Sequence, residues 1–400
     1  MLTRKQYLLS TLLVCFAAST TLAQASMAEF QQVLREKASI EERDLAALQL
    51  NQPVVRLVPT SNKREVAVTG LVNINTSAED FLRSYRDSML QKSNAAILQI
   101  GRFGPEPALA DIASLSLEAK DIEDLKECVA GACQVKLSAP MIERFRKEID
   151  WAAPDYQLRA TNLFKEMLVA YIKDYRARGE AALIEYSDKR DRVSLANEQR
   201  ELRSAGGYIN SVLADTKSGL QLIEETLVWS KMKFGLKPVI AVNHISIYKR
   251  DSGVGPQVLV ASKQIYANHY FNAFHALTAF VNVPGATYVV YENRSRADGL
   301  EGPFGKIKRG VVEKKALEGL RGIIAQSKAS LEGPTLTAST DEFSARSSDG
   351  WGHRLFGGIR PLLWLLVLSA IIALLVLGRR RADIATAAKA KALKPESVKS

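Results

Sequence analysis

Apolar and polar residues recur along the chain with two different periods, which divide it into helices and strands. Residues 26–50 have apolar positions at helical spacing and predict one helix. Residues 54–58 and 64–74 then alternate as strands do, with a turn between them, and are expected to pair as a β-ribbon. A capping box at residues 76–79 follows at once and predicts a short helix. A further strand is predicted over residues 95–103.

The middle of the chain changes to a helical period, from Pro140 to residue 235. Its clearest part is an amphipathic stripe formed by Ala160, Leu163, Phe164, Met167, Tyr171 and Tyr175. Such a stripe is typical of a helix packed on a core, and the alternative is that the block lines or covers a cavity. Residues 220–232 complete the block, and we expect them to be helical as well.

The strand signal returns after residue 237. Residues 238–249 and 257–267 flank a glycine-containing loop, and residues 270–282 and 286–293 flank a Val-Pro-Gly turn. These two hairpins predict four adjacent antiparallel strands. Residues 270–282 also fit a helix, but the Pro-Gly turn requires a partner for the strand that follows it, which favours a strand here.

A long helix is predicted from Pro303 to about Leu331. One side carries a buried apolar stripe, and the other carries lysines and arginines that either face solvent or contact anionic lipid. The chain is therefore expected to fold as α+β. In this prediction an antiparallel sheet packs on the long C-terminal helix, and residues 140–235 form a helical insertion.

Two separate stretches carry a resemblance to a known fold. Residues 64–92 form a strand that leads straight into a capped helix, and residues 237–331 form antiparallel strands followed by a long helix. This order is similar to the helix-grip fold of START-like lipid-binding proteins and polyketide-cyclase-like proteins, with residues 140–235 as an insertion. The resemblance implies a curved sheet that grips the long helix, with a cavity between them for an apolar ligand. It carries over no catalytic residues.

The C-terminal part of the chain has the pattern of a membrane anchor. Residues 361–378 contain an uncharged apolar run long enough to cross a bilayer. The arginines directly after it predict that residues 379–400 form a basic cytoplasmic tail. We therefore expect residues 26–332 to form an extracytoplasmic, periplasmic domain on a flexible stalk, residues 333–360. One span would tether this domain to the inner membrane.

The N-terminal residues 1–25 have the layout of a secretory signal peptide, with a positive start, an apolar stretch and a small-residue cleavage motif. The full chain has a formal net charge of +11, to which Arg4 and Lys5 contribute +2 and residues 379–400 contribute +5, leaving +4 for the rest. The basic composition is thus mainly a membrane-orientation signal. It does not favour nucleic acid as a partner.

Two cysteines follow the signal peptide, Cys128 and Cys133, with Gly131 between them. In an oxidising compartment this spacing favours a local disulfide. Free thiols and metal ligation are the alternatives, and a zinc site would need two further ligands nearby. We expect a disulfide and no metal site.

Common enzyme motifs are absent from the sequence. It contains no G-x-S-x-G, H-E-x-x-H or G-x-G-x-x-G segment, and nothing in it predicts a cofactor. The candidates to orient a ligand are polar residues of the strand-rich region, namely His244, Tyr248, Gln264, Tyr266, Tyr288, Tyr291, Arg294 and Arg296. The two arginines have an alternative role, in which they brace the junction between the last strand and the long helix.

These patterns favour a binding role over an enzymatic one. We expect a membrane-tethered envelope protein whose extracytoplasmic domain binds an apolar or lipid-like ligand. One alternative is an interaction scaffold that uses residues 140–235 against another envelope protein. The other is an enzyme with a site near His244 and Tyr266.

Overall fold

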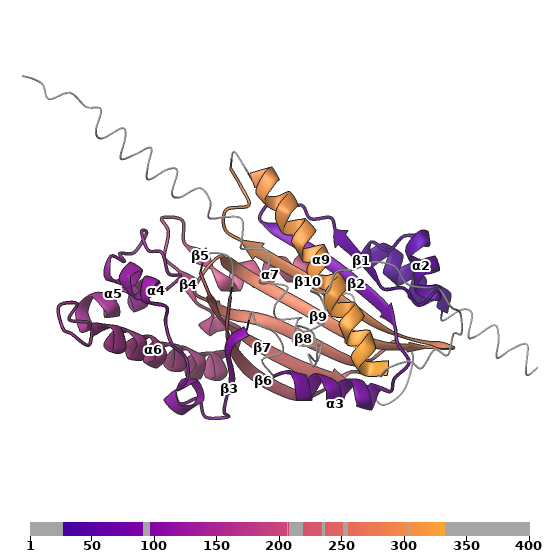
Figure 1. Ribbon diagram of the computed structural model, residues 1–400, viewed down its shortest axis with the longest axis horizontal. Coiled ribbons are helices and arrows are strands. Elements are labelled where there is room, and N and C mark those ends of the chain that lie inside the picture. The colour runs from indigo at the N-terminus through magenta and orange to yellow at the C-terminus, as the bar shows by residue number, and fades with distance from the viewer. Residues whose placement is uncertain are drawn as a thin grey trace, which may run out of the picture.

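The computed structural model describes residues 27–90, 97–205, 207, 219–233, 237–250, 255–302 and 305–332. The predicted signal peptide, stalk, membrane span and cytoplasmic tail lie outside these ranges. Within them, no helix combines the length and the apolar character needed to cross a bilayer. The described residues form an α+β fold built on one large antiparallel sheet (Figure 1).

The sheet has eight strands in the order β1-β2-β10-β9-β8-β7-β6-β3. All neighbouring strands in it are antiparallel. The strands are β1 Val54–Val58, β2 Glu65–Asn73, β3 Ile97–Phe103, β6 Gln221–Met232, β7 Val239–Lys249, β8 Gly255–Ala267, β9 Phe271–Val283 and β10 Ala286–Ala297. A separate small ribbon consists of β4 Glu185–Tyr186 and β5 Val193–Ser194.

Helices pack on both faces of the large sheet. The last described helix lies diagonally across the sheet, and three of the helices between β3 and β6, labelled α4, α5 and α6, gather at one end of it (Figure 1). A helical segment at residues 27–38 precedes the elements that carry labels. The labelled helices are α2 Glu42–Gln49, α3 Ala78–Ser88, α4 Ala119–Lys126, α5 Ala139–Glu148, α6 Tyr156–Arg178, α7 Leu195–Ser204 and α9 Gly305–Glu332.

The two faces of the sheet bury different sets of apolar side chains. The α9 face carries a cluster that buries Ala316 and Leu320 of α9, and its sheet members include Val228, Ile245, Val260, Phe274, Ala276 and Tyr291. The opposite face, here called the insertion face, packs against α4, α5 and α6, and its sheet members include Leu227, Trp229, Ile240, Val242 and Tyr266. The predicted aromatic stripe of α6 is buried in this second cluster.

Most of the predicted elements are present. The four strands after residue 237 are confirmed as β7 to β10, and the ambiguous stretch 270–282 is a strand. Residues 220–232 were expected to be helical, and this is wrong because β6 occupies residues 221–232. The second half of β6 is buried on both faces, so its apolar residues form a continuous run, which does not distinguish a strand from a buried helix.

Of two further local predictions, the N-terminal helix is wrong in part and the disulfide is confirmed. The single helix expected over residues 26–50 is interrupted at Ser39, whose φ of 57° breaks the helical path. The expected disulfide is present between Cys128 and Cys133, with a Cα–Cα distance of 4.5 Å. It closes the loop that follows α4, so it ties this part of the chain to itself.

Gly70 of β2 lies directly against two side chains of α9. A Cβ atom at this position would overlap Cδ1 of Ile324 and lie 3.0 Å from Cδ2 of Leu320, both on α9. A side chain would therefore have to displace the ends of the Ile324 and Leu320 side chains. The absence of one allows the long helix to sit directly on the strand.

We predict that Gly70→Ala lowers the free energy of unfolding by about 1–3 kcal/mol, because it overpacks this contact. Ile324→Val removes the overlapping Cδ1 atom and costs about 0.5–1.5 kcal/mol alone. The double variant should lose less stability than the sum of the two, measured by urea unfolding with tryptophan fluorescence.

Gly310→Ala is the matched control for this prediction. Gly310 also lies on α9, but a Cβ atom there meets nothing within 4 Å. This substitution should stabilise the protein by up to about 1 kcal/mol, because alanine has the higher helix propensity. Additive effects of Gly70→Ala and Ile324→Val would show that the two positions do not touch.

Candidate functional site

A band of uncharged polar side chains crosses the α9 face of the sheet. Successive residues of a strand point to opposite faces, so a residue two positions from a member of the α9-face cluster shares its face. By this rule several polar residues of the strands β6 to β10 point toward the α9 side. The name polar band is used here for five of them, namely Ser230, Asn243, Ser262, Thr278 and Asn293. All five are buried.

Three residues of this band have polar atoms without a hydrogen-bond partner in the described part of the chain. These atoms are Oγ of Ser230, Oγ of Ser262, and both Oδ1 and Nδ2 of Asn293. Asn293 is fully buried, with 0% of its surface exposed. Burying such groups unpaired costs about 1–3 kcal/mol each, so this face contains polar groups that an apolar core alone does not need.

The strand register places two of these residues close together. Asn293 of β10 lies opposite Ala276 of β9, and Ala276 lies opposite Ser262 of β8. The small side chain of Ala276 therefore separates two polar groups on the same face. Burial raises the pKa of the neighbouring Tyr291 hydroxyl.

The ligand residues expected from the sequence divide between the two faces. Tyr291 belongs to the α9-face cluster. Gln264 sits at a β-bulge between β7 and β8, where its carbonyl oxygen accepts a hydrogen bond from Gln199 of α7. The remaining members lie on the insertion face, by their clusters or by strand alternation from them, namely His244, Tyr248, Tyr266, Tyr288, Arg294 and Arg296. The predicted residues therefore do not converge on one site.

Arg294 and Arg296 belong to a buried network of ion pairs. Arg294 contacts Glu65 and Glu292, each at 2.8 Å, and Arg296 contacts Glu65 at 3.2 Å and Glu198 of α7 at 3.1 Å. These bonds join β2, β10 and the inserted helix α7. The arrangement fits the bracing role considered for the two arginines, because their guanidinium groups are directed at carboxylates of the protein itself.

Sequence reasoning missed most of the polar band. Asn243, Thr278 and Ser230 were not singled out, because isolated polar residues inside a strand look like the solvent side of an amphipathic element. The available signal was their position within strands that are apolar on both faces. A polar residue in such a strand has no solvent side to point to.

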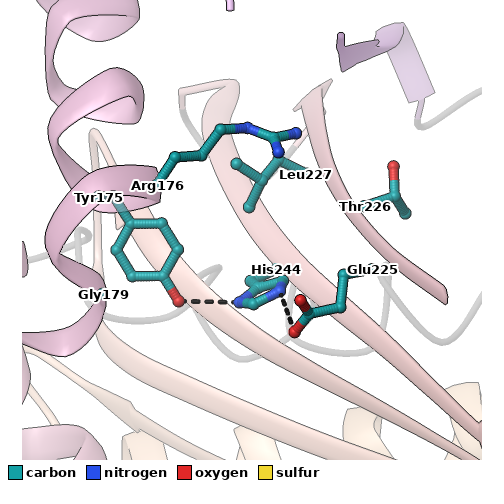
Figure 2. A pocket seen from close by; sticks show the side chains of 7 residues that line it. All are labelled: Tyr175, Arg176, Gly179, Glu225, Thr226, Leu227 and His244. Atoms are coloured by element: carbon teal, nitrogen blue, oxygen red, sulfur yellow. Dashed lines mark hydrogen bonds and ion pairs between the residues drawn. The ribbon is translucent and has the colours of Figure 1, made fainter. Parts of the chain in front are cut away.

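A pocket opens on the insertion face, between the C-terminal end of α6 and strands β6 and β7 (Figure 2). Its volume is about 200 Å³. The Tyr175 hydroxyl lies 2.9 Å from Nδ1 of His244, and Nε2 of His244 lies 3.2 Å from a carboxylate oxygen of Glu225. Arg176 reaches over the other side of the pocket (Figure 2).

This geometry changes the partner expected for His244. The sequence paired His244 with Tyr266, but the Tyr266 hydroxyl donates a hydrogen bond to the backbone carbonyl of Lys136 at 3.0 Å. The tyrosine that contacts His244 is Tyr175. It comes from the insertion, and periodicity within either segment could not have paired them.

Comparison with protein-family models, with curated proteins and with solved structures finds no match for this chain. The functional argument therefore rests on the geometry of the chain itself.

His275 gives a test of the electrostatics on the insertion face. It lies on β9 between Lys263 of β8 and Arg294 of β10. Burial, together with Arg203 and Lys263, lowers the pKa of its imidazole to about 4 from 6.5. The ring is therefore neutral in the folded protein over a range in which the unfolded chain binds a proton.

We predict that His275 makes the protein less stable as the pH falls from about 6.5 to about 4. Its contribution is fully present above this window and is lost within it, by about 3 kcal/mol in total. His275→Gln cannot titrate, so its free energy of unfolding should fall less between pH 7 and pH 4.5 in urea titrations. Equal losses in both proteins would contradict the assignment.

Proposed function

We propose that this chain is a membrane-tethered envelope protein whose domain, residues 26–332, binds an apolar or lipid-like ligand between the sheet and α9. The observation that supports this most directly is the set of unpaired polar atoms on the α9 face, on Ser230, Ser262 and Asn293. They lie among apolar side chains of the cluster that contacts α9. Unpaired groups in such surroundings are suited to a partner that the chain itself does not supply.

The chemistry of the α9 face favours a neutral amphiphile. Its walls are aliphatic and aromatic, with Ile245, Val260 and Phe274 among them, and they suit a hydrocarbon body. The polar groups of the band are hydroxyls and amides without charge. Asn293 offers one donor group and one acceptor group, which suits a ligand hydroxyl, amide or ester carbonyl better than a charged headgroup.

The order of elements supports the helix-grip resemblance as part of this proposal. β2 leads into α3, the antiparallel strands follow, and α9 comes last. β2 also pairs with β10, so the first strand of this series lies beside the last one, and α9 packs on β2. This arrangement provides a helix held against one face of a sheet, as the proposed ligand site requires.

The tether is proposed from the sequence outside the described residues. The apolar segment 361–378, with basic residues 379–400 after it, would hold the domain at the outer surface of the inner membrane. Residues 333–360 would act as a stalk, because their first part, 333–350, is rich in serine, threonine, glycine and acidic residues. A domain held at this distance has direct access to membrane lipid.

We predict that Asn293→Leu reduces the amount of bound lipid. The full-length protein is purified in detergent, bound lipids are extracted with organic solvent, and their amount per mole of protein is measured by mass spectrometry. The substitution removes the unpaired amide and places an apolar group of similar size there. Without its hydrogen bonds a specific ligand should bind at least about tenfold more weakly.

Asn282→Leu is the matched control, because Asn282 is exposed near the end of β9. It should leave the specifically bound lipid unchanged, so lipid that merely surrounds the anchor cancels in the comparison. Asn293→Leu should also raise the stability of the lipid-free protein by about 1–3 kcal/mol, since an unsatisfied polar group is removed. If Asn293→Leu does not fold, Ser262→Ala replaces it. Equal lipid content in the wild type, the control and these variants would overturn the proposal.

A further inference from the structure

The pocket beside His244 is separate from the proposed ligand site. It lies on the insertion face, whereas the polar band lies on the α9 face. Its volume of about 200 Å³ is below the roughly 300–1,000 Å³ of sites for drug-sized ligands. The pocket therefore suits a small molecule and is too small for a lipid chain.

The hydrogen bonds around His244 fix where its proton lies. An ionised carboxylate can only accept hydrogen bonds, so Nε2 of His244 carries the hydrogen that faces Glu225. The neutral ring then leaves Nδ1 as an acceptor, and the Tyr175 hydroxyl donates to it. Burial lowers the pKa of His244, against a smaller raising by Glu225, which keeps the ring neutral near pH 7.

This chain of contacts has the geometry of a base-activated hydroxyl. A nucleophile within hydrogen-bond reach of a base, with that base oriented by a third group, is the common arrangement of nucleophilic catalysis. Here the groups are Tyr175, His244 and Glu225, with separations of 2.9 Å and 3.2 Å. Burial raises the pKa of the Tyr175 hydroxyl, against a smaller lowering by Lys263. The hydroxyl therefore keeps its proton at rest and needs a base to react.

Arg176 supplies a positive charge on the other side of the same pocket (Figure 2). Within the described ranges its guanidinium group takes part in no ion pair. Other exposed arginines of α6 do find acids, as Arg178 does with Asp174. Arg176 is thus positioned to bind an anionic group of a small molecule while the Tyr175 hydroxyl faces the rest of it.

We propose that this pocket is a second site, which binds a small electrophilic molecule carrying an anionic group and reacts with it through the Tyr175 hydroxyl. Arg176 binds the anionic group. Tyr175 Oη forms the new bond to the electrophilic centre, and its proton passes to Nδ1 of His244. The leaving group departs with the electron pair of the bond that breaks. Glu225 stabilises the imidazolium ion that results.

The proposal is tested by chemical labelling of the full-length protein with two aryl sulfonyl fluorides. One is 4-(fluorosulfonyl)benzoate, which carries a carboxylate, and the other is neutral benzenesulfonyl fluoride. Attack by a tyrosine oxygen on sulfur releases fluoride and leaves a stable sulfonate ester. Peptide mass spectrometry then gives the labelling rate of each tyrosine. Tyr248, which is partly exposed on β7 and does not line this pocket, is the internal reference.

We expect Tyr175 to react faster than Tyr248 with both probes. His244→Gln keeps a hydrogen-bonding side chain but cannot take the proton, so Tyr175 labelling should slow by about tenfold or more. Arg176→Gln should slow labelling by the carboxylate probe about tenfold and leave the neutral probe unaffected. Tyr175→Phe should abolish the modification at this position.

Glu225→Gln is the second variant if His244→Gln does not fold, because Glu225 is half exposed and tolerates change. It should slow Tyr175 labelling with both probes, since the imidazolium ion loses its carboxylate. Tyr175 labelling that is unchanged in both His244→Gln and Glu225→Gln would overturn the base activation. Equal effects of Arg176→Gln on the two probes would overturn the anionic site. Neither result bears on lipid content, so the two proposals fail independently.

Discussion

Burial of both faces of one sheet is the constraint on which the rest of the structure depends. The central strands have no solvent side, so every polar group on them must find a partner inside the protein or from a ligand. The insertion face meets this requirement with charged residues, and Glu65 alone joins both Arg294 and Arg296. The α9 face places uncharged groups there, and within the described residues the side chains of Ser262 and Asn293 have unpaired polar atoms. The ion pairs brace the insertion face, and the unpaired uncharged groups are the basis of the proposed ligand site.

The two proposed sites share strands without sharing a cavity. β6 contributes Ser230 to the polar band on one side and Glu225 to the pocket on the other. β7 does the same with Asn243 and His244, which are adjacent in sequence and point to opposite faces. The insertion completes the pocket through Tyr175 and covers the strands that form its floor. The sheet thus carries the proposed apolar ligand site on one face and the small polar pocket on the other.

The sequence predicted the elements whose own residues have a recognisable period or a turn. The short helix after β2, the hairpins after residue 237 and the α6 stripe all have local signals and are present. The cap of the short helix is Ser77, which accepts a hydrogen bond from the Asp80 backbone N–H, so the capping box expected at residues 76–79 is displaced by one residue. β6 was misassigned because a strand buried on both faces has no alternation to detect. The sites were harder to predict, because they depend on register and topology that single segments do not encode. Tyr175 contacts His244 from the insertion, and Asn293 and Ser262 lie on either side of Ala276 in the sheet. His244 does line a pocket, but the tyrosine that contacts it is Tyr175, which comes from elsewhere in the chain.

The pairing of β2 with β10 has a consequence for how the domain is made. Thr69 Oγ1 donates a hydrogen bond to the carbonyl oxygen of Tyr291, 222 residues later in the chain. β2 can therefore pair with β10 only after nearly the whole domain has been synthesised. Contacts between residues so far apart in sequence slow folding. Until then the edge of β2 that faces β10 is unpaired, and unpaired strand edges promote aggregation. The proposed membrane span follows soon after α9 in the sequence, so the chain would be anchored at about the moment when its sheet first closes.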